Sequence, residues 1–203
     1  MTHRIVPATA LALLIPLCAA AADPAPAPAA APNYAIIEIG ELIAKVARRT
    51  GKQFIVDPRV RADVPLIGLD ADRVDYPRLL AILNVNMFAT YEAGGLVRVV
   101  PDANARQLPI PVTSEVPAKA LDDELVTVML TPKNMCTAQA VPVLRPLMPQ
   151  AAHMAAYPLS NTLVISDRAA NARRLVDMVE RLDKAAPAGQ KCPEWTPVKS
   201  DSK

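Results

Sequence analysis

The chain has 203 residues, a formal net charge of +2 and an aromatic content of 3%. A nearly balanced charge and few aromatic side chains argue against a nucleic-acid surface, which needs a basic patch and stacking platforms. Beyond the N-terminal segment the sequence holds one histidine, His153, and none of the short motifs that mark nucleophile, phosphate or zinc sites. We therefore expect no enzyme activity, no metal, no cofactor and no nucleic-acid partner.

Residues 1–22 are predicted to be a secretory signal peptide. Arg4 precedes an apolar run that ends at Leu17, and small residues up to Ala22 provide a cleavage site. The run is shorter than the ~20 residues that a membrane span needs. Lipidation of Cys18 is the alternative, but leucine is larger than the residue usually found before a lipidated cysteine. We expect an exported chain.

Residues 23–32 read DPAPAPAAAP, and this alternation is typical of an extended spacer. The folded part is expected to begin at residue 33. About 150 residues then remain before a polar tail at 184–203, which is predicted to be disordered. That length is enough for one ordinary domain or two small ones, and the spacing of proline and glycine favours two.

The first folded domain is predicted over residues 33–100. It opens with a strand around Ile37 and Ile39 and a helix over 41–50, which ends at Gly51. Four more strands are predicted, at residues 54–56, 64–67, 88–91 and 96–100. The last two strands are expected to form a hairpin across a glycine turn.

Acidic residues precede the second helix of this domain. Asp70, Asp72 and Asp75 are spaced somewhat like the oxygen ligands of a calcium loop. Val74 stands at a ligand position and the turn glycine is missing, so we favour a solvated loop. Asp75 is then the helix cap, with Pro77 in the first turn.

Residues 101–123 contain several prolines and little periodicity, which predicts an extended linker. A second domain is predicted over 124–183 in the order β-α-β-β-α. Its strands are expected at residues 124–130, 153–157 and 162–165, with one helix from 136 or 137 to 147. Pro142 removes a backbone hydrogen bond from that helix, so we expect a kink or a late start.

The last helix is predicted to begin at a cap formed by Ser166 and Asp167 and to be amphipathic. Its apolar residues recur at three- and four-residue steps: Ala172, Leu175, Val176, Val179 and Leu182. Its other face carries the charged residues Arg173, Arg174, Glu180 and Arg181. A solvated face is the simplest interpretation of these charges, and contact with a neighbouring subunit is the alternative.

Two cysteines, Cys136 and Cys192, follow the predicted signal peptide. An exported chain folds where disulfides persist, so these two residues could pair. Alternatively, Cys136 is a small buried residue at a helix start, and Cys192 stays free or pairs between chains. Their spacing permits the intramolecular bond, but the sequence does not determine its geometry.

Four long stretches carry a family resemblance: TGKQFIVDPRV (50–60), VRVVPDANARQ (97–107), ELVTVMLTPKNMCTAQAVPVLRPLMPQ (124–150) and AAYPLSNTLVISDRAANARRLVDMVERLD (155–183). The first two resemble the first periplasmic domain of type II secretion secretins, the general secretion pathway protein D family. The last two resemble the KH-like domain that follows it. Both matches come in the family's order.

This resemblance implies an α+β fold of two small domains. The first would be of the type found in TonB-dependent receptor signalling domains, with helices sandwiched between small sheets. The second would place two helices on one three-stranded sheet. In the family, the first domain contacts the inner-membrane clamp protein, and the second packs against copies of itself in a ring. The family continues into a pore-forming domain that we expect this chain to lack.

Three functions follow as hypotheses. The first is a non-enzymatic periplasmic component of type II secretion, associated with the outer-membrane complex. It would bind secretin ring subunits or the clamp protein and would self-associate weakly. The second is a free-standing periplasmic signalling or receptor-associated binding module. The third is a truncated secretin remnant that folds but has lost its role.

Overall fold

The computed structural model describes residues 34–188 and Cys192. The predicted signal peptide, the spacer, Cys18 and most of the predicted tail lie outside the described residues. Residues from Tyr34 onward group into one compact unit, which contains both predicted domains. No helix in the part of the chain that the structure describes is long and apolar enough to cross a membrane.

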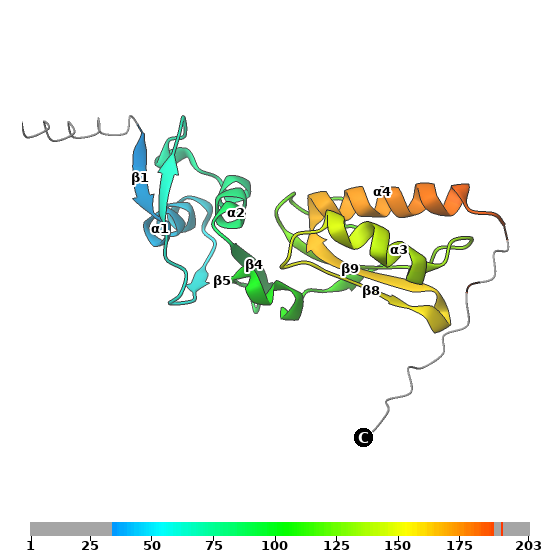
Figure 1. The fold of residues 1–203 in the computed structure, drawn as a ribbon. Coiled ribbons are helices and arrows are strands. Elements are labelled where there is room, and N and C mark those ends of the chain that lie inside the picture. The colour runs from blue at the N-terminus through cyan, green and yellow to red at the C-terminus, as the bar shows by residue number, and fades with distance from the viewer. Residues whose placement is uncertain (1–33, 189–191, 193–203) are drawn as a thin grey trace, which may run out of the picture. The chain divides into compact units, whose positions relative to one another are not determined.

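The first domain combines two small sheets with two helices (Figure 1). In chain order its main elements are β1 (Ala35–Glu38), α1 (Ile39–Thr50), β2 (Phe54–Val56), β3 (Asp63–Leu66), α2 (Tyr76–Val85), β4 (Phe88–Ala93) and β5 (Leu96–Pro101). Strand β1 pairs with β3 antiparallel, and β5 lies between β2, which is parallel to it, and β4, which is antiparallel. Both helices and both sheets supply residues to one apolar core.

The start of α1 differs from the predicted one. The pattern placed Ile39 in a strand, but Ile39 is the first residue of the helix and is fully buried. The Glu38 carboxylate accepts a hydrogen bond from the Glu41 amide, so it caps the helix two residues earlier than expected. The predicted end is confirmed, because Gly51 adopts a φ of 70° and donates its amide to the Ala47 carbonyl.

The second domain places two helices on one face of a sheet (Figure 1). Its elements are β6 (Val112–Thr113), β7 (Leu125–Leu130), α3 (Thr137–Leu144), β8 (His153–Tyr157), β9 (Thr162–Arg168) and α4 (Ala169–Ala185). The strand order is β6-β7-β9-β8, with β6 parallel to β7 and the other pairs antiparallel. The mixed helix and sheet content and the small domains confirm the predicted α+β class.

The sheet of the second domain has four strands instead of the three that the resemblance implied. The additional strand, β6, lies inside the segment predicted to be an extended linker, where Val112 is the register partner of Thr127. The same segment contains a 3₁₀ helix, Asp102–Gln107. Much of this segment therefore belongs to the fold.

Pro142 lies inside α3, which begins at Thr137, so a late start is wrong and the alternative, a kink, stays a prediction. The α-helical part ends at Leu144 and continues as a 3₁₀ turn, Arg145–Leu147. Proline cannot donate the backbone hydrogen bond that its position requires, which is consistent with an α-helix of only eight residues.

The predicted cap of α4 is also wrong. Ser166 and Asp167 belong to β9, and neither side chain caps the helix, whose N-cap residue is Arg168. Instead, the first helical amides, of Ala169 and Ala170, donate to main-chain carbonyl groups of residues 124 and 122, at 2.8 and 3.0 Å. The helix start is satisfied by the chain segment that leads into β7.

Candidate interaction surfaces

The β1–β3 sheet presents apolar side chains to solvent. Alternation along β1 buries Ile37 and leaves Ile36 57% exposed, opposite Pro65 of β3. Ile67, just beyond β3, is 73% exposed. Each of the two strands has a second edge that no described strand occupies. Open strand edges beside exposed apolar side chains suit recognition of another chain.

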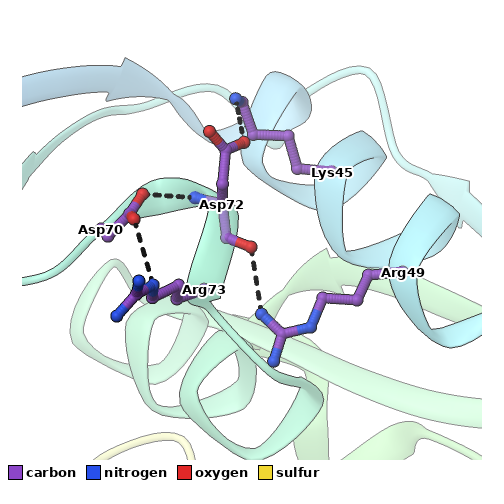
Figure 2. A network of polar contacts seen from close by, with 5 residues as sticks. All are labelled: Lys45, Arg49, Asp70, Asp72 and Arg73. Carbon is purple, nitrogen blue, oxygen red and sulfur yellow. Dashed lines mark hydrogen bonds and ion pairs between the residues drawn. The ribbon is translucent and has the colours of Figure 1, made fainter.

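The acidic loop between β3 and α2 is fastened to α1 (Figure 2). The Asp72 carboxylate lies 2.6 Å from Lys45 Nζ, and Arg49 donates to the Asp72 carbonyl at 3.1 Å. Asp70 accepts from the Asp72 amide and pairs with Arg73. A hydrogen bond from Lys45 lowers the pKa of Asp72. These acids thus bind side chains and backbone groups of their own domain.

Asp75 caps α2, as predicted, because its Oδ1 accepts a hydrogen bond from the Arg78 amide at 3.0 Å. Pro77 lies in the first turn of the helix. This arrangement does not support the calcium-loop alternative, because Asp75 caps a helix and Val74 is buried in the core. His153, the one histidine beyond the predicted signal peptide, is an exposed residue of β8.

The sheet face opposite α3 and α4 is largely uncharged. Met129 of β7 is 45% exposed and has Val164 of β9 as its register partner. Thr127 Oγ1 donates to Ser166 Oγ on the same face at 3.2 Å. Val112 of β6 extends this face and is 57% exposed. Such a face can pack against another protein surface without burying charge.

The face of α4 that carries the predicted interface residues divides into two parts. Arg173 binds its own chain: Nη1 donates to Asp122 Oδ1 at 2.8 Å and Nη2 donates to the Ala120 carbonyl. Arg174 and Glu180 are exposed. Arg181 pairs with Asp177 one turn away, at 2.9 Å. Arg174, Glu180 and Arg181 therefore remain accessible, whereas Arg173 is engaged within the chain.

Cys136 and Cys192 form a disulfide in the structure, with their Cα atoms 5.4 Å apart. Cys136 is buried and is the N-cap residue of α3, but it makes no side-chain cap hydrogen bond. The bond therefore joins a residue beyond α4 to the start of α3, across a sequence separation of 56 residues.

Asn161 is a structural residue that the sequence pattern did not single out. It adopts a φ of 50° in the turn before β9. Its Oδ1 accepts from the amide and the hydroxyl of Thr137, and its Nδ2 donates to the carbonyls of Pro132 and Met135. One side chain thus caps α3 and holds the loop before it. The turn cluster of residues 158–161 was a signal for the backbone conformation, although not for these partners.

Asp183, near the end of α4, holds the other side of the same loop. Its carboxylate accepts hydrogen bonds from the amides of Lys133, Asn134 and Met135. Burial raises the pKa of Asp183, but the three backbone donors outweigh it and the pKa lies below its usual range. Asn161 and Asp183 together determine the conformation of the chain between β7 and α3.

Comparison with known proteins finds two family models. Residues 32–99 match the GspD-like N0 domain, and residues 127–188 match the bacterial type II/III secretion system short domain. Secretin XcpQ of Pseudomonas aeruginosa is 31% identical over 90% of this chain and 29% of its own length. Secretin GspD of Vibrio cholerae is 33% identical over 73% of this chain and 23% of its own length. The chain thus spans less than a third of the relatives it matches.

A solved complex resembles both domains together. It is the type II secretion system outer membrane complex of Klebsiella pneumoniae, described as containing PulD, PulS and the PulC HR domain. The TM-score is 0.64 at 30% sequence identity, and the match covers 75% of this chain and 26% of that chain.

Proposed function

The chain belongs to the secretin family of type II protein secretion through its two N-terminal domains, and we propose that it works as a non-enzymatic module in the periplasm. It binds secretin ring subunits, the inner-membrane clamp protein, or both. The observation that carries this proposal is the match of both domains, in the family's order, to a single solved secretin complex. Function in such a module depends on surfaces and not on a reactive site.

The β1–β3 sheet is the surface that we assign to the clamp protein. The Klebsiella complex that this chain resembles contains a PulC HR domain together with PulD and PulS. The free strand edges offer main-chain pairing to an added strand, and the exposed side chains of Ile36 and Ile67 beside them offer apolar contact.

The second domain is the part that we assign to self-association. Its open sheet face around Met129 and the accessible charges of α4, Arg174, Glu180 and Arg181, could both meet a neighbouring copy. A domain of this size buries little surface per neighbour, so the affinity between two copies is expected to be low and a ring would depend on avidity.

Binding to purified partners tests the proposal. The chain from residue 23 onward is titrated with the clamp protein's periplasmic domain and, separately, with the N-terminal domains of a full-length secretin. Ile36→Asp is expected to weaken clamp binding about tenfold or more, because it places a charge in the centre of the contact. Val143→Asp, at an apolar residue of α3 that is 61% exposed, is the matched control and is expected to bind as wild type does.

Failure to bind either partner at ~100 μM would refute the proposed function. Equal loss of binding in both variants would instead refute the assignment of the clamp to the β1–β3 sheet. A monomer at every concentration in light scattering would refute self-association alone.

A further inference from the structure

The segment of residues 120–124, just before β7, is held at three of its five residues by the beginning of α4. The Ala169 and Ala170 amides donate to the carbonyls of Glu124 and Asp122. Arg173 adds a hydrogen bond to the Asp122 carboxylate and one to the carbonyl of residue 120. A segment with this many partners from one helix start cannot behave as a free spacer.

Arg168, the residue before α4, extends these contacts to the first domain. Its Nη1 donates to the Asp123 carbonyl at 2.8 Å, and its Nη2 donates to the Phe88 carbonyl, at the start of β4, at 2.9 Å. The residue is only 9% exposed. A buried guanidinium is costly unless its donors are satisfied, and here both partners are main-chain carbonyl groups in different parts of the fold.

Two further contacts join the first domain to the segment at the start of β7. Asn84, near the end of α2, donates from Nδ2 to Asp123 Oδ1 at 2.6 Å. Three buried residues form an apolar cluster: Ala89 of β4, Ala105 of the 3₁₀ helix that follows β5, and Leu125 of β7, which is the register partner of Arg168. Polar and apolar contacts thus close around Arg168 from both domains.

We propose that Arg168 is a positioning residue that latches the second domain to the first, so that the two domains move as one rigid body. The latch consists of Arg168, Asn84 and Asp123, with Phe88 contributing its carbonyl. A force on the first domain, or a movement of that domain caused by a bound partner, then moves the second domain as well. This inference does not depend on which partner binds.

Backbone ¹⁵N relaxation of the chain from residue 23 onward tests the latch, because it reports the rotational correlation time of each domain. In the wild-type protein both domains are expected to share one correlation time. In Arg168→Ala the two times separate and both become shorter, and exchange of the Ala169 and Ala170 amides accelerates about tenfold or more. Arg168→Lys retains the charge but not the planar fork, so we expect intermediate behaviour.

Lys184→Ala, at an exposed position near the end of the same helix and outside the proposed self-association surface, is the control and is expected to leave the common correlation time unchanged. If Arg168→Ala unfolds the second domain, Asn84→Ala tests the latch from the other side, because Asn84 lies outside that domain. Independent tumbling of the wild-type domains would overturn the proposal. An unchanged common correlation time in both Arg168→Ala and Asn84→Ala would also overturn it.

Discussion

The two domains satisfy their helix ends in different ways. In the first domain the groups that cap helices are close in sequence: Glu38 and Asp75 cap the residues three positions on, and Gly51 closes α1 against Ala47. In the second domain the start of α3 is capped by Asn161, which lies 24 positions away in sequence. The loop before α3 is held by Asp183, which lies up to 50 positions away. The helix ends of the first domain thus depend on nearby groups, and those of the second domain on distant ones.

This difference affects how the stabilities of the elements depend on one another. A local cap forms as soon as its helix does, so it stabilises an element by itself. A distant cap forms only when the surrounding strands and helices are already assembled, so it couples their stabilities. We expect single polar substitutions to be more costly in the second domain than in the first.

Loss of the disulfide should have the largest effect on this comparison. Reduction, or the double change Cys136→Ser with Cys192→Ser, is expected to destabilise the second domain by about 2–4 kcal/mol, because the bond closes a long loop in the unfolded chain. Urea denaturation with domain-resolved amide signals measures this loss. The first domain serves as the internal control, and equal destabilisation of both domains would contradict a local role.

Asn161→Ala is expected to cost about 2–3 kcal/mol in the same assay, because it removes the cap of α3 and leaves two partly buried loop carbonyls without donors. Asn161→Gly separates the two roles of the residue, since glycine accepts a φ of 50° without strain but brings no side chain. If glycine restored wild-type stability, the backbone conformation alone would explain the effect, against our interpretation.

Asp75→Ala tests a local cap in the first domain and is expected to cost about 1 kcal/mol, less than Asn161→Ala. Asp75→Asn retains a side-chain oxygen for the Arg78 amide and should be close to wild type. Native-state hydrogen exchange of the α2 amides reports both variants. A cost for Asp75→Ala larger than that for Asn161→Ala would reverse the comparison between the domains.

The smallest effect is a pH dependence. The pKa of Asp183 is lower in the folded state, so its ionised form contributes stability that is present above the ordinary pKa of ~3.9. This contribution is lost as the pH falls through the lower folded-state value. The stability difference between wild type and Asp183→Asn should therefore shrink between about pH 5 and pH 3. Urea midpoints across this range measure it, and a difference independent of pH would contradict the assignment.

Periodicity and turn residues predicted much of the first domain. Strand β2 has the predicted bounds, Asp75 caps the start of α2, and Gly51 ends α1, all as expected. These signals are local, so a short window of sequence contains both the cap and the group that it satisfies. The error at Ile39 arose because one apolar residue at the junction fits a strand and a helix equally well.

Prediction was weaker where partners are far apart in sequence. Nothing near Val112 identifies Thr127 as its strand partner, so β6 was assigned to a linker. Arg168 was overlooked because its partners are main-chain carbonyl groups, which every residue carries. Ser166 and Asp167 have the side chains of a cap, yet pairing with β7 keeps them in β9.

Strand β6 also limits how copies of this protein can join. It is a two-residue strand at one side of the four-stranded sheet, which leaves β8 as the one long outer edge among the described strands of that sheet. Short edge strands are poor templates for further pairing. Two copies that paired through β8 would consume both long edges and stop at a dimer of two-fold symmetry. Any larger closed assembly built from the second domain must therefore be joined by helix surfaces, sheet faces or loops, and not by a continuous sheet of that domain.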